Sequence, residues 1–203
     1  MLPRNELEVL ASLFPDKDYK TIKEIQKKCG YSYERVYSAV LSLRKKNILE
    51  LKKYGNVIVA GVNYNSDFAL LGFIHYAINR KLNFYEKQKN ILYGGELSKS
   101  GTSRVADSDE ISKCIKKVEN LNAEFMSVID VSTKPKNKIT FFYIGDKKLE
   151  NELLGLEYKY NIRLDSVKGT IELLKDQENA KKYLEGVILK GFEKFFTAFY
   201  YNK

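Results

Sequence analysis

The 203-residue sequence has few of the residues on which disulfide-bonded and metal-bound folds depend. Its two cysteines, Cys29 and Cys114, and its single histidine, His75, are too few for a disulfide framework or a Cys/His zinc site. Both cysteines occur in segments with a helical pattern, where we expect buried and reduced thiols. His75 has no cysteine or carboxylate at a useful spacing, so we expect a packed, hydrogen-bonded histidine. We therefore predict neither a metal ion nor a cofactor.

The sequence also lacks long apolar runs. No stretch of about 18 apolar residues occurs, so we expect no membrane-spanning helix. The opening residues, MLPRNELEVL, lack the apolar core of a signal peptide. Apolar residues nevertheless make up 44% of the chain, which is enough for a sizeable core in one large or two small domains. We expect a soluble, cytoplasmic protein.

Basic residues outnumber acidic ones, and the net charge is +9 with a pI of about 9.3. Residues 1–66 contain 12 Lys and Arg against 7 Asp and Glu, so this smaller part of the chain carries more than half of the excess charge. A basic surface favours a polyanionic partner, because lysines that contact phosphates release bound counterions. Abundant Lys and Glu are also typical of a thermostable surface, and this alternative stays open.

Residues 1–66 have the periodicity of three helices followed by a β-hairpin. Thr21 and Glu24 form a capping-box pattern at the second helix, and Gly30 is suited to end it. Ser32 can cap the third helix, in which one stripe is apolar: Val36, Ala39, Val40 and Leu43. The expected elements are helices at 4–14, 19–30 and 31–47 and strands at 48–53 and 57–62.

This succession resembles the winged-helix family of DNA-binding domains, and it is similar to archaeal and bacterial regulators of the MarR, ArsR and TrmB type. The resemblance covers the first third of the chain and implies double-stranded DNA as the partner, with 32–47 as the recognition helix. It implies contacts to bases near the helix start and contacts to phosphates near the hairpin. The candidate DNA-binding residues are Thr21, Ser32, Tyr33, Glu34, Arg35, Tyr37, Ser38, Arg44, Lys45, Lys46, Lys52, Lys53 and Tyr54.

Glu34 fits this surface least well, although a carboxylate can accept a hydrogen bond from a cytosine amino group. Winged helices also serve as protein-interaction modules, which leaves a non-catalytic adaptor as an alternative function. A lysine-rich hairpin can equally be a solvated edge that prevents aggregation.

A long helix follows the hairpin, at 63–90, and begins at a cap on Ser66 or Asp67. Its apolar residues recur at helical spacing at Phe68, Leu71, Ile74, Ile78 and Leu82. In winged-helix regulators the helix after the hairpin often carries the dimer contact. The resemblance therefore implies a homodimer in which residues 67–90 act as a linker and dimerisation helix.

Residues 91–203 alternate between helical and strand-like patterns in the order α-β-β-α-β-α. The expected elements are helices at 108–122, 147–160 and 170–200, the last of which Gly186 or Gly191 can break, and strands at 125–131, 138–144 and 161–167. Such an order predicts a small mixed sheet with flanking helices, and an α+β protein overall.

The end of the chain, with YNIRLDSV, IELLKDQEN and GVILKG, resembles the minimal nucleotidyltransferases that archaea often fuse to winged helices. In that family a Gly-Ser turn and an Asp-x-Asp pair on a strand hold two metal ions. One alignment places these features at Gly94-Gly95 and at Asp107 and Asp109. It implies an active, Mg²⁺-dependent nucleotidyltransferase, of the kind paired with toxin partners. The residues after Asp109, however, have a helical period.

A second alignment uses the strands at 125–131 and 138–144, and it satisfies both period and distance. The Gly-Ser position is then Val131-Ser132, the two aspartates are Lys138 and Thr140, and only Asp165 remains. Protonated lysine cannot ligate a metal. We prefer this alignment, which predicts an inactive domain for dimerisation or for binding a nucleotide, effector or protein. An α+β domain unrelated to nucleotidyltransferases remains the alternative. The sequence therefore favours a DNA-binding transcriptional regulator without catalytic residues.

Overall fold

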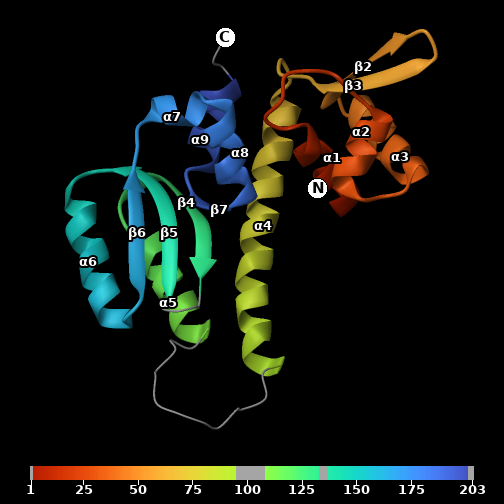
Figure 1. Ribbon diagram of the computed structural model, residues 1–203. Coiled ribbons are helices and arrows are strands. Elements are labelled where there is room, and N and C mark those ends of the chain that lie inside the picture. Colours follow the sequence, from red (N-terminus) through yellow and green to blue (C-terminus); the bar gives the residue numbers. More distant parts are fainter. Residues whose placement is uncertain (1, 95–107, 133–136, 201–203) are drawn as a thin grey trace. The chain divides into compact units, whose positions relative to one another are not determined.

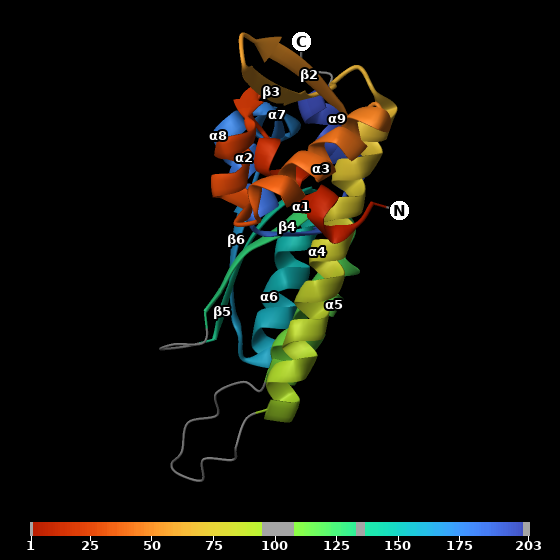
Figure 2. The same cartoon turned by 90° about the vertical axis from the view of Figure 1, so that its right-hand side faces the viewer.

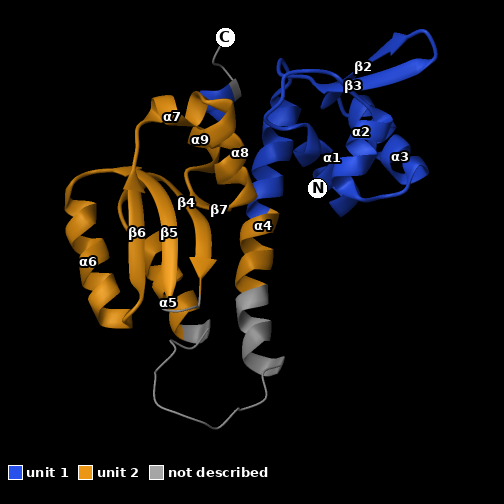
Figure 3. Cartoon of the chain, in the orientation of Figure 1, with its two compact units in different colours: residues 1–78, 196–203 blue, residues 79–195 orange. Residues whose placement is uncertain are grey.

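The computed structural model describes residues 2–94, 108–132 and 137–200 (Figure 1). The chain forms two compact units, the first made of residues 1–78 and 196–203 and the second of residues 79–195 (Figure 3). Two helices, α4 (Asp67–Gly94) and α9 (Phe192–Tyr200), contribute to both units. Each unit contains one sheet and several helices, so the expected α+β class is confirmed.

The first unit begins with three helices, α1 (Arg4–Leu13), α2 (Ile22–Cys29) and α3 (Tyr33–Lys45). The predicted capping box is present, since Thr21 Oγ1 accepts from the backbone N–H of Glu24 at 3.2 Å and Glu24 Oε2 accepts from that of Thr21 at 2.7 Å. Gly30 ends α2 with a left-handed φ of 70°. The Ser32 hydroxyl accepts from the backbone N–H of Arg35, so both predicted helix starts are confirmed.

A three-stranded antiparallel sheet accompanies these helices, in the order β1-β3-β2. Its strands are β1 (Lys20–Thr21), β2 (Leu49–Tyr54) and β3 (Val57–Val62). The hairpin of β2 and β3 has the predicted turn, and its tip lies beyond α1, α2 and α3 (Figure 2). β1 was not predicted, because two residues are too few to show a strand period.

The core of the first unit has an aliphatic part and an aromatic part. The predicted stripe of α3 is buried, with Val36, Val40 and Leu43 fully so. The rings of Phe14, Phe73, Phe196 and Phe199 form a buried cluster, with centroids 5.1 Å apart for Phe14 and Phe73 and 5.6 Å apart for Phe73 and Phe196. The end of α9 therefore completes the core that α1 begins.

The second unit has a four-stranded mixed sheet in the order β6-β5-β4-β7. Among the strands that the structure describes, β5 and β6 pair in parallel and the other neighbours in this sheet are antiparallel. The strands are β4 (Ala123–Ser132), β5 (Lys138–Gly145), β6 (Arg163–Lys168) and β7 (Val187–Lys190), and the helices that lie wholly in this unit are α5 (Ser108–Glu119), α6 (Lys148–Tyr160), α7 (Ile171–Lys175) and α8 (Gln177–Glu185). The mixed sheet with flanking helices is as the sequence predicts.

Alternate residues of β5 enter two different cores. Phe141 and Tyr143 pack with the apolar residues of α5 and α6 on one face of the sheet. On the other face, Phe142 stacks on Tyr183 of α8 with ring centroids 4.4 Å apart. The second half of α4 joins this unit through Glu119 of α5, which accepts hydrogen bonds from Lys81 at 2.5 Å and Tyr85 at 2.6 Å.

The helix expected at 170–200 is wrong as one continuous element, because this segment forms α7, α8, β7 and α9, whereas the break expected at Gly186 or Gly191 is confirmed at both glycines. The interruption is caused by two glycines that flank β7 and lie against the backbone of β4. A Cβ at Gly186 would lie 2.3 Å from the carbonyl oxygen of Val128, and one at Gly191 would lie 2.3 Å from that of Glu124. The three apolar residues between them, Val187, Ile188 and Leu189, are too short a run to distinguish strand from helix by period.

We predict that Gly191→Ala destabilises the protein. Gly191 has a φ of 78°, a conformation that costs a residue with a side chain about 1–3 kcal/mol, and the new methyl group also meets the β4 backbone. Gly155→Ala is the control, because nothing lies within 4 Å of its Cβ position in α6. There we expect a gain of about 0.5–1 kcal/mol. Urea unfolding followed by circular dichroism measures both, and equal stabilities would contradict the close approach of β7 to β4.

Candidate nucleic-acid interface

The first two turns of α3 present a polar and aromatic surface. Tyr33, Glu34 and Ser38 are exposed and Tyr37 is half-buried. The rings of Tyr33 and Tyr37 are stacked, with centroids 6.2 Å apart and an interplanar angle of 8°. They lie four residues apart, which places them one above the other on one helix face. Four of the candidate residues thus form one continuous patch.

Arg35 is also exposed, but it points to a different neighbour. Its guanidinium lies 4.3 Å from the ring centroid of Tyr31, a cation–π contact at the start of the helix. The hydroxyls of Ser32 and Thr21 are engaged in capping α3 and α2. Thr21 also donates to Glu24 at 2.8 Å. These two candidates therefore have a structural role at helix starts, which their position before a helix indicates.

The end of α3 is basic, and its three cations differ in environment. Arg44 and Lys45 are exposed in the last turn. The Lys46 ammonium lies 2.5 Å from Oε2 of Glu6, a buried carboxylate on α1 that also accepts from the Ser42 hydroxyl at 2.8 Å. Lys46 thus neutralises a buried charge in the core. Sequence analysis missed this role, and its only signal was an acidic residue among the apolar positions of the first helix.

The hairpin carries Lys52, Lys53 and Tyr54 at its exposed end. The Lys52 ammonium lies 3.9 Å from the ring centroid of Tyr19, whose hydroxyl donates to Glu50 at 2.5 Å. A hydrogen bond with Tyr19 raises the pKa of Lys52 and so favours its charged form. Lys52 is held in place by its neighbours while remaining exposed to a ligand.

The second unit places the residues of the proposed nucleotidyltransferase alignment on neighbouring strands. Lys138 pairs with Arg163 and Thr140 with Asp165 across the parallel strands β5 and β6. The Asp165 carboxylate is 2.6 Å from the Lys138 ammonium and 2.8 Å from Nε of Arg163. Hydrogen bonds from Lys138 and then Arg163 lower the pKa of Asp165. Two cations of the chain itself therefore surround this carboxylate.

Of the two aspartates of the enzyme alternative, the one that the structure describes lies on a helix. Asp109 lies in the first turn of α5, and Asp107 lies outside the described residues. Gly94 is the last residue of α4, and Gly95 also lies outside. Among the residues that the structure describes, no group of three or more His, Cys, Asp or Glu is placed to hold a metal ion.

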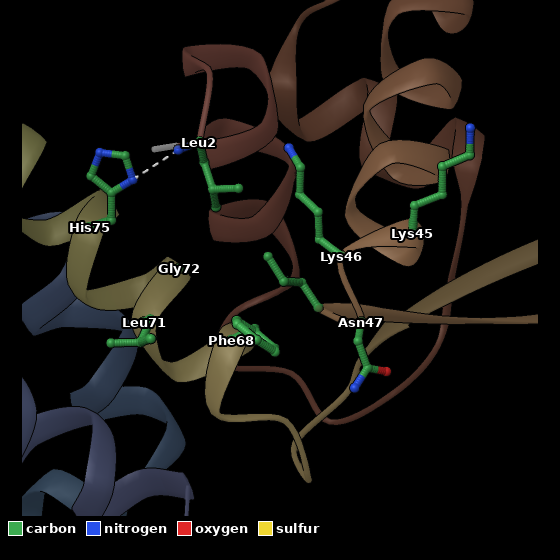
Figure 4. A pocket seen from close by; sticks show the side chains of 9 residues that line it. Leu2, Lys45, Lys46, Asn47, Phe68, Leu71, Gly72 and His75 are labelled. Carbon is green, nitrogen blue, oxygen red and sulfur yellow. Dashed lines mark hydrogen bonds between the residues drawn. The ribbon is translucent and has the colours of Figure 1, made fainter.

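One face of α4 in the first unit is apolar and exposed. Phe68, Leu71 and Ile78 are 62%, 58% and 39% exposed, whereas Ala69, Phe73 and Ala77 of the same helix are buried. Phe68 and Leu71 also line an apolar cavity of about 670 Å³ beside the end of α3 (Figure 4). The other lining residues are Leu2, Lys45, Lys46, Asn47, Ile48, Gly72 and His75.

The histidine and the cysteines take the places expected of them, with one difference. Nδ1 of His75 accepts from the backbone N–H of Leu2 at 3.3 Å, and burial lowers the pKa of the ring (Figure 4). His75 is thus packed and hydrogen-bonded, as predicted. Cys114 is buried, and burial raises the pKa of its thiol to about 12. Cys29 is only half-buried, with its thiol 3.5 Å from the carbonyl oxygen of Glu8.

Comparisons with protein-family models, with curated proteins and with solved structures find no match to this chain. Within the described ranges, no helix is long and apolar enough to cross a membrane.

We predict that Lys46→Ala lowers stability and that Lys45→Ala does not. Loss of the Lys46 ammonium leaves the buried Glu6 carboxylate with a single hydroxyl donor, which costs about 1–3 kcal/mol. Lys45 is one residue away, exposed and of the same charge, and its removal should change the free energy of unfolding by less than about 0.5 kcal/mol. Thermal and urea unfolding measure both variants. Matching stabilities would show that the Lys46–Glu6 pair contributes nothing.

Proposed function

We propose that this protein is a DNA-binding transcriptional regulator whose first unit is a winged helix-turn-helix domain with α3 as the recognition helix. The observation that carries the proposal is the exposed surface of α3 and the adjoining hairpin. It combines a polar first half of the helix with cations at the end of α3 and on β2. The contribution of β1 to the hairpin sheet supports the same fold, because it fixes the hairpin against the start of α2.

The two ends of this surface have different tasks in a DNA complex. Arg44, Lys45, Lys52 and Lys53 contact phosphates, which hold the protein in register on the duplex without selecting a sequence. The first two turns of α3 enter the major groove and face the base edges. The net charge of +9 supports both encounter and affinity through counterion release.

The second unit acts, in this proposal, without catalysis. Its sheet order is compatible with a degenerate nucleotidyltransferase-like domain that dimerises or binds a nucleotide or protein partner. In the preferred alignment a lysine occupies a metal-ligand position, and its ammonium already pairs with Asp165. A carboxylate surrounded by two cations has little remaining affinity for a divalent ion. In that alignment, this contact supports an inactive domain.

The exposed face of α4 supports a homodimer. Phe68, Leu71, His75 and Ile78 follow one another at intervals of three, four and three residues, and Leu82 continues the series. This alternation is the spacing with which one helix packs its apolar seam against another. The exposed apolar residues of this series, Phe68, Leu71, Ile78 and Leu82, fit a second copy of the same helix, and a dimer would present two recognition helices to two half-sites.

For DNA binding, we expect duplex affinity to fall steeply with salt. The double variant Lys52→Ala, Lys53→Ala should weaken binding to all sequences about equally and reduce the slope of log K against log salt by about 2. The control Lys147→Ala, Lys148→Ala removes the same charge from exposed positions in the second unit and should leave the slope unchanged. Fluorescence anisotropy between about 50 and 200 mM salt measures the slopes. A duplex affinity that depends neither on salt concentration nor on Lys52 and Lys53 would refute the proposal.

For the dimer, we expect Leu71→Glu to give a folded monomer, because it places a charge in the apolar seam of α4. Leu71 is exposed in the single chain, so its replacement should not disturb the core. Leu154→Glu is the control, since Leu154 is 64% exposed on α6, away from the seam. Sedimentation equilibrium gives the mass of each variant. A monomeric unmutated protein, or a Leu71→Glu protein that stays dimeric, would rule out this interface.

A further inference from the structure

The surface that would face the bases has an unusual set of side chains. Around the α3 axis, Tyr33 and Tyr37 lie within about 40° of each other, and Glu34 and Ser38 adjoin them at about 100° and 140°. Arg35 lies about 200° from Tyr33 and about 60° from Ser38, and its guanidinium contacts the Tyr31 ring. From Tyr33 to Ser38, this face therefore presents two phenol rings, one carboxylate and one hydroxyl, and the exposed Arg35 borders it.

Cations appear on the same face only at the other end of the helix. Arg44 lies about 16 Å along the axis from Tyr33, at nearly the same angle, and Lys45 follows it. The base-facing and phosphate-facing ends of α3 are therefore separated along the helix. The phosphate contacts of the proposed function do not involve Tyr33, Glu34 or Tyr37.

The usual contacts for purines are missing from this patch. Guanine is most often bound through Arg or Lys at O6 and N7, and adenine through Asn or Gln at N6 and N7. Tyr33, Glu34, Tyr37 and Ser38 include none of these residues, and the neighbouring arginine, Arg35, is in contact with the Tyr31 ring. A carboxylate is repelled by the two acceptors of guanine and can accept from the amino group of cytosine. Glu34, the least expected residue of the surface, thus disfavours guanine.

The tyrosine pair offers apolar contact instead. Tyr33 is 43% exposed and its ring lies parallel to that of Tyr37, with centroids 6.2 Å apart, so the pair presents apolar ring surface to solvent. In the major groove, only thymine presents a methyl group, and apolar side chains recognise it. Resting on the proposed function, we propose that the Tyr33–Tyr37 pair recognises the 5-methyl group of thymine, with Glu34 selecting against guanine beside it.

The expected effect follows from the area that one methyl group buries. Removing a buried methyl group costs about 0.8 kcal/mol, which corresponds to about a fourfold rise in Kd. Deoxyuridine differs from thymidine only in lacking this group, so the replacement leaves base pairing unchanged. A roughly fourfold rise in Kd when deoxyuridine replaces thymidine at one or two positions of a bound duplex is therefore the result expected of a tyrosine–methyl contact.

The test uses the full chain and a 20-base-pair duplex obtained by selection from a random library. Each thymidine of that duplex is replaced in turn by deoxyuridine, and Kd is measured at constant salt. The unmutated protein should lose about fourfold at one or two positions. Tyr33→Ala should bind more weakly but no longer distinguish thymidine from deoxyuridine there, whereas Tyr33→Phe, which keeps the ring, should retain the distinction.

Two controls separate the ring contact from a general loss of affinity. Tyr158→Ala removes a tyrosine that is 93% exposed on α6, and it should behave like the unmutated protein. Lys52→Ala, Lys53→Ala should weaken every duplex while preserving the deoxyuridine effect. The far-ultraviolet circular dichroism of Tyr33→Ala should match that of the parent, because Tyr33 lies outside the buried stripe.

The outcomes are distinguishable. Salt-dependent duplex binding with no sensitive thymidine, or with sensitivity that persists in Tyr33→Ala, overturns the thymine contact and leaves the proposed function standing. Absence of salt-dependent duplex binding overturns both. Tighter binding of either single strand than of the duplex also overturns the thymine contact, since it would mean that the tyrosines stack on unpaired bases.

Discussion

The buried cluster of Phe14, Phe73, Phe196 and Phe199 determines how the first unit is closed. Aromatic rings in tilted and offset contact contribute both buried area and a specific geometry. Phe73 fixes which face of α4 turns inward, and the opposite face, with Phe68 and Leu71, is therefore left outside. The exposed seam on which the proposed dimer depends is thus a consequence of where one aromatic side chain is buried.

A second constraint acts on α3. Its stripe of Val36, Ala39, Val40 and Leu43 must face the core, and a helix with 3.6 residues per turn then has no freedom in what it presents to solvent. Tyr33, Glu34 and Ser38 are exposed for this reason. The chemistry of the candidate interface is consequently determined by the positions of apolar residues that never touch a ligand.

The sequence predicted well those features that depend on neighbours within one or two turns. The capping box at Thr21, the cap at Ser32 and the stripe of α3 are local patterns, and each is confirmed. Pairings between distant segments were missed. β1 exists only because Lys20 and Thr21 meet β3, and the exposed Lys46 has a structural role only because Glu6 lies buried 40 residues earlier. In such a pair, neither segment has a sequence periodicity from which the other segment could be predicted.

The segment 170–200 shows why local pattern alone misleads. Its apolar residues suit one long helix, but Gly186 and Gly191 allow the chain to approach β4 closer than any side chain permits. The cost of burying bare backbone is offset by the pairing of Ser127 and Val128 with β7. Glycine destabilises the interior of a helix, but here it is required for β7 to pair with β4. The close approach of Gly191 to β4 also fixes the place at which α9 begins.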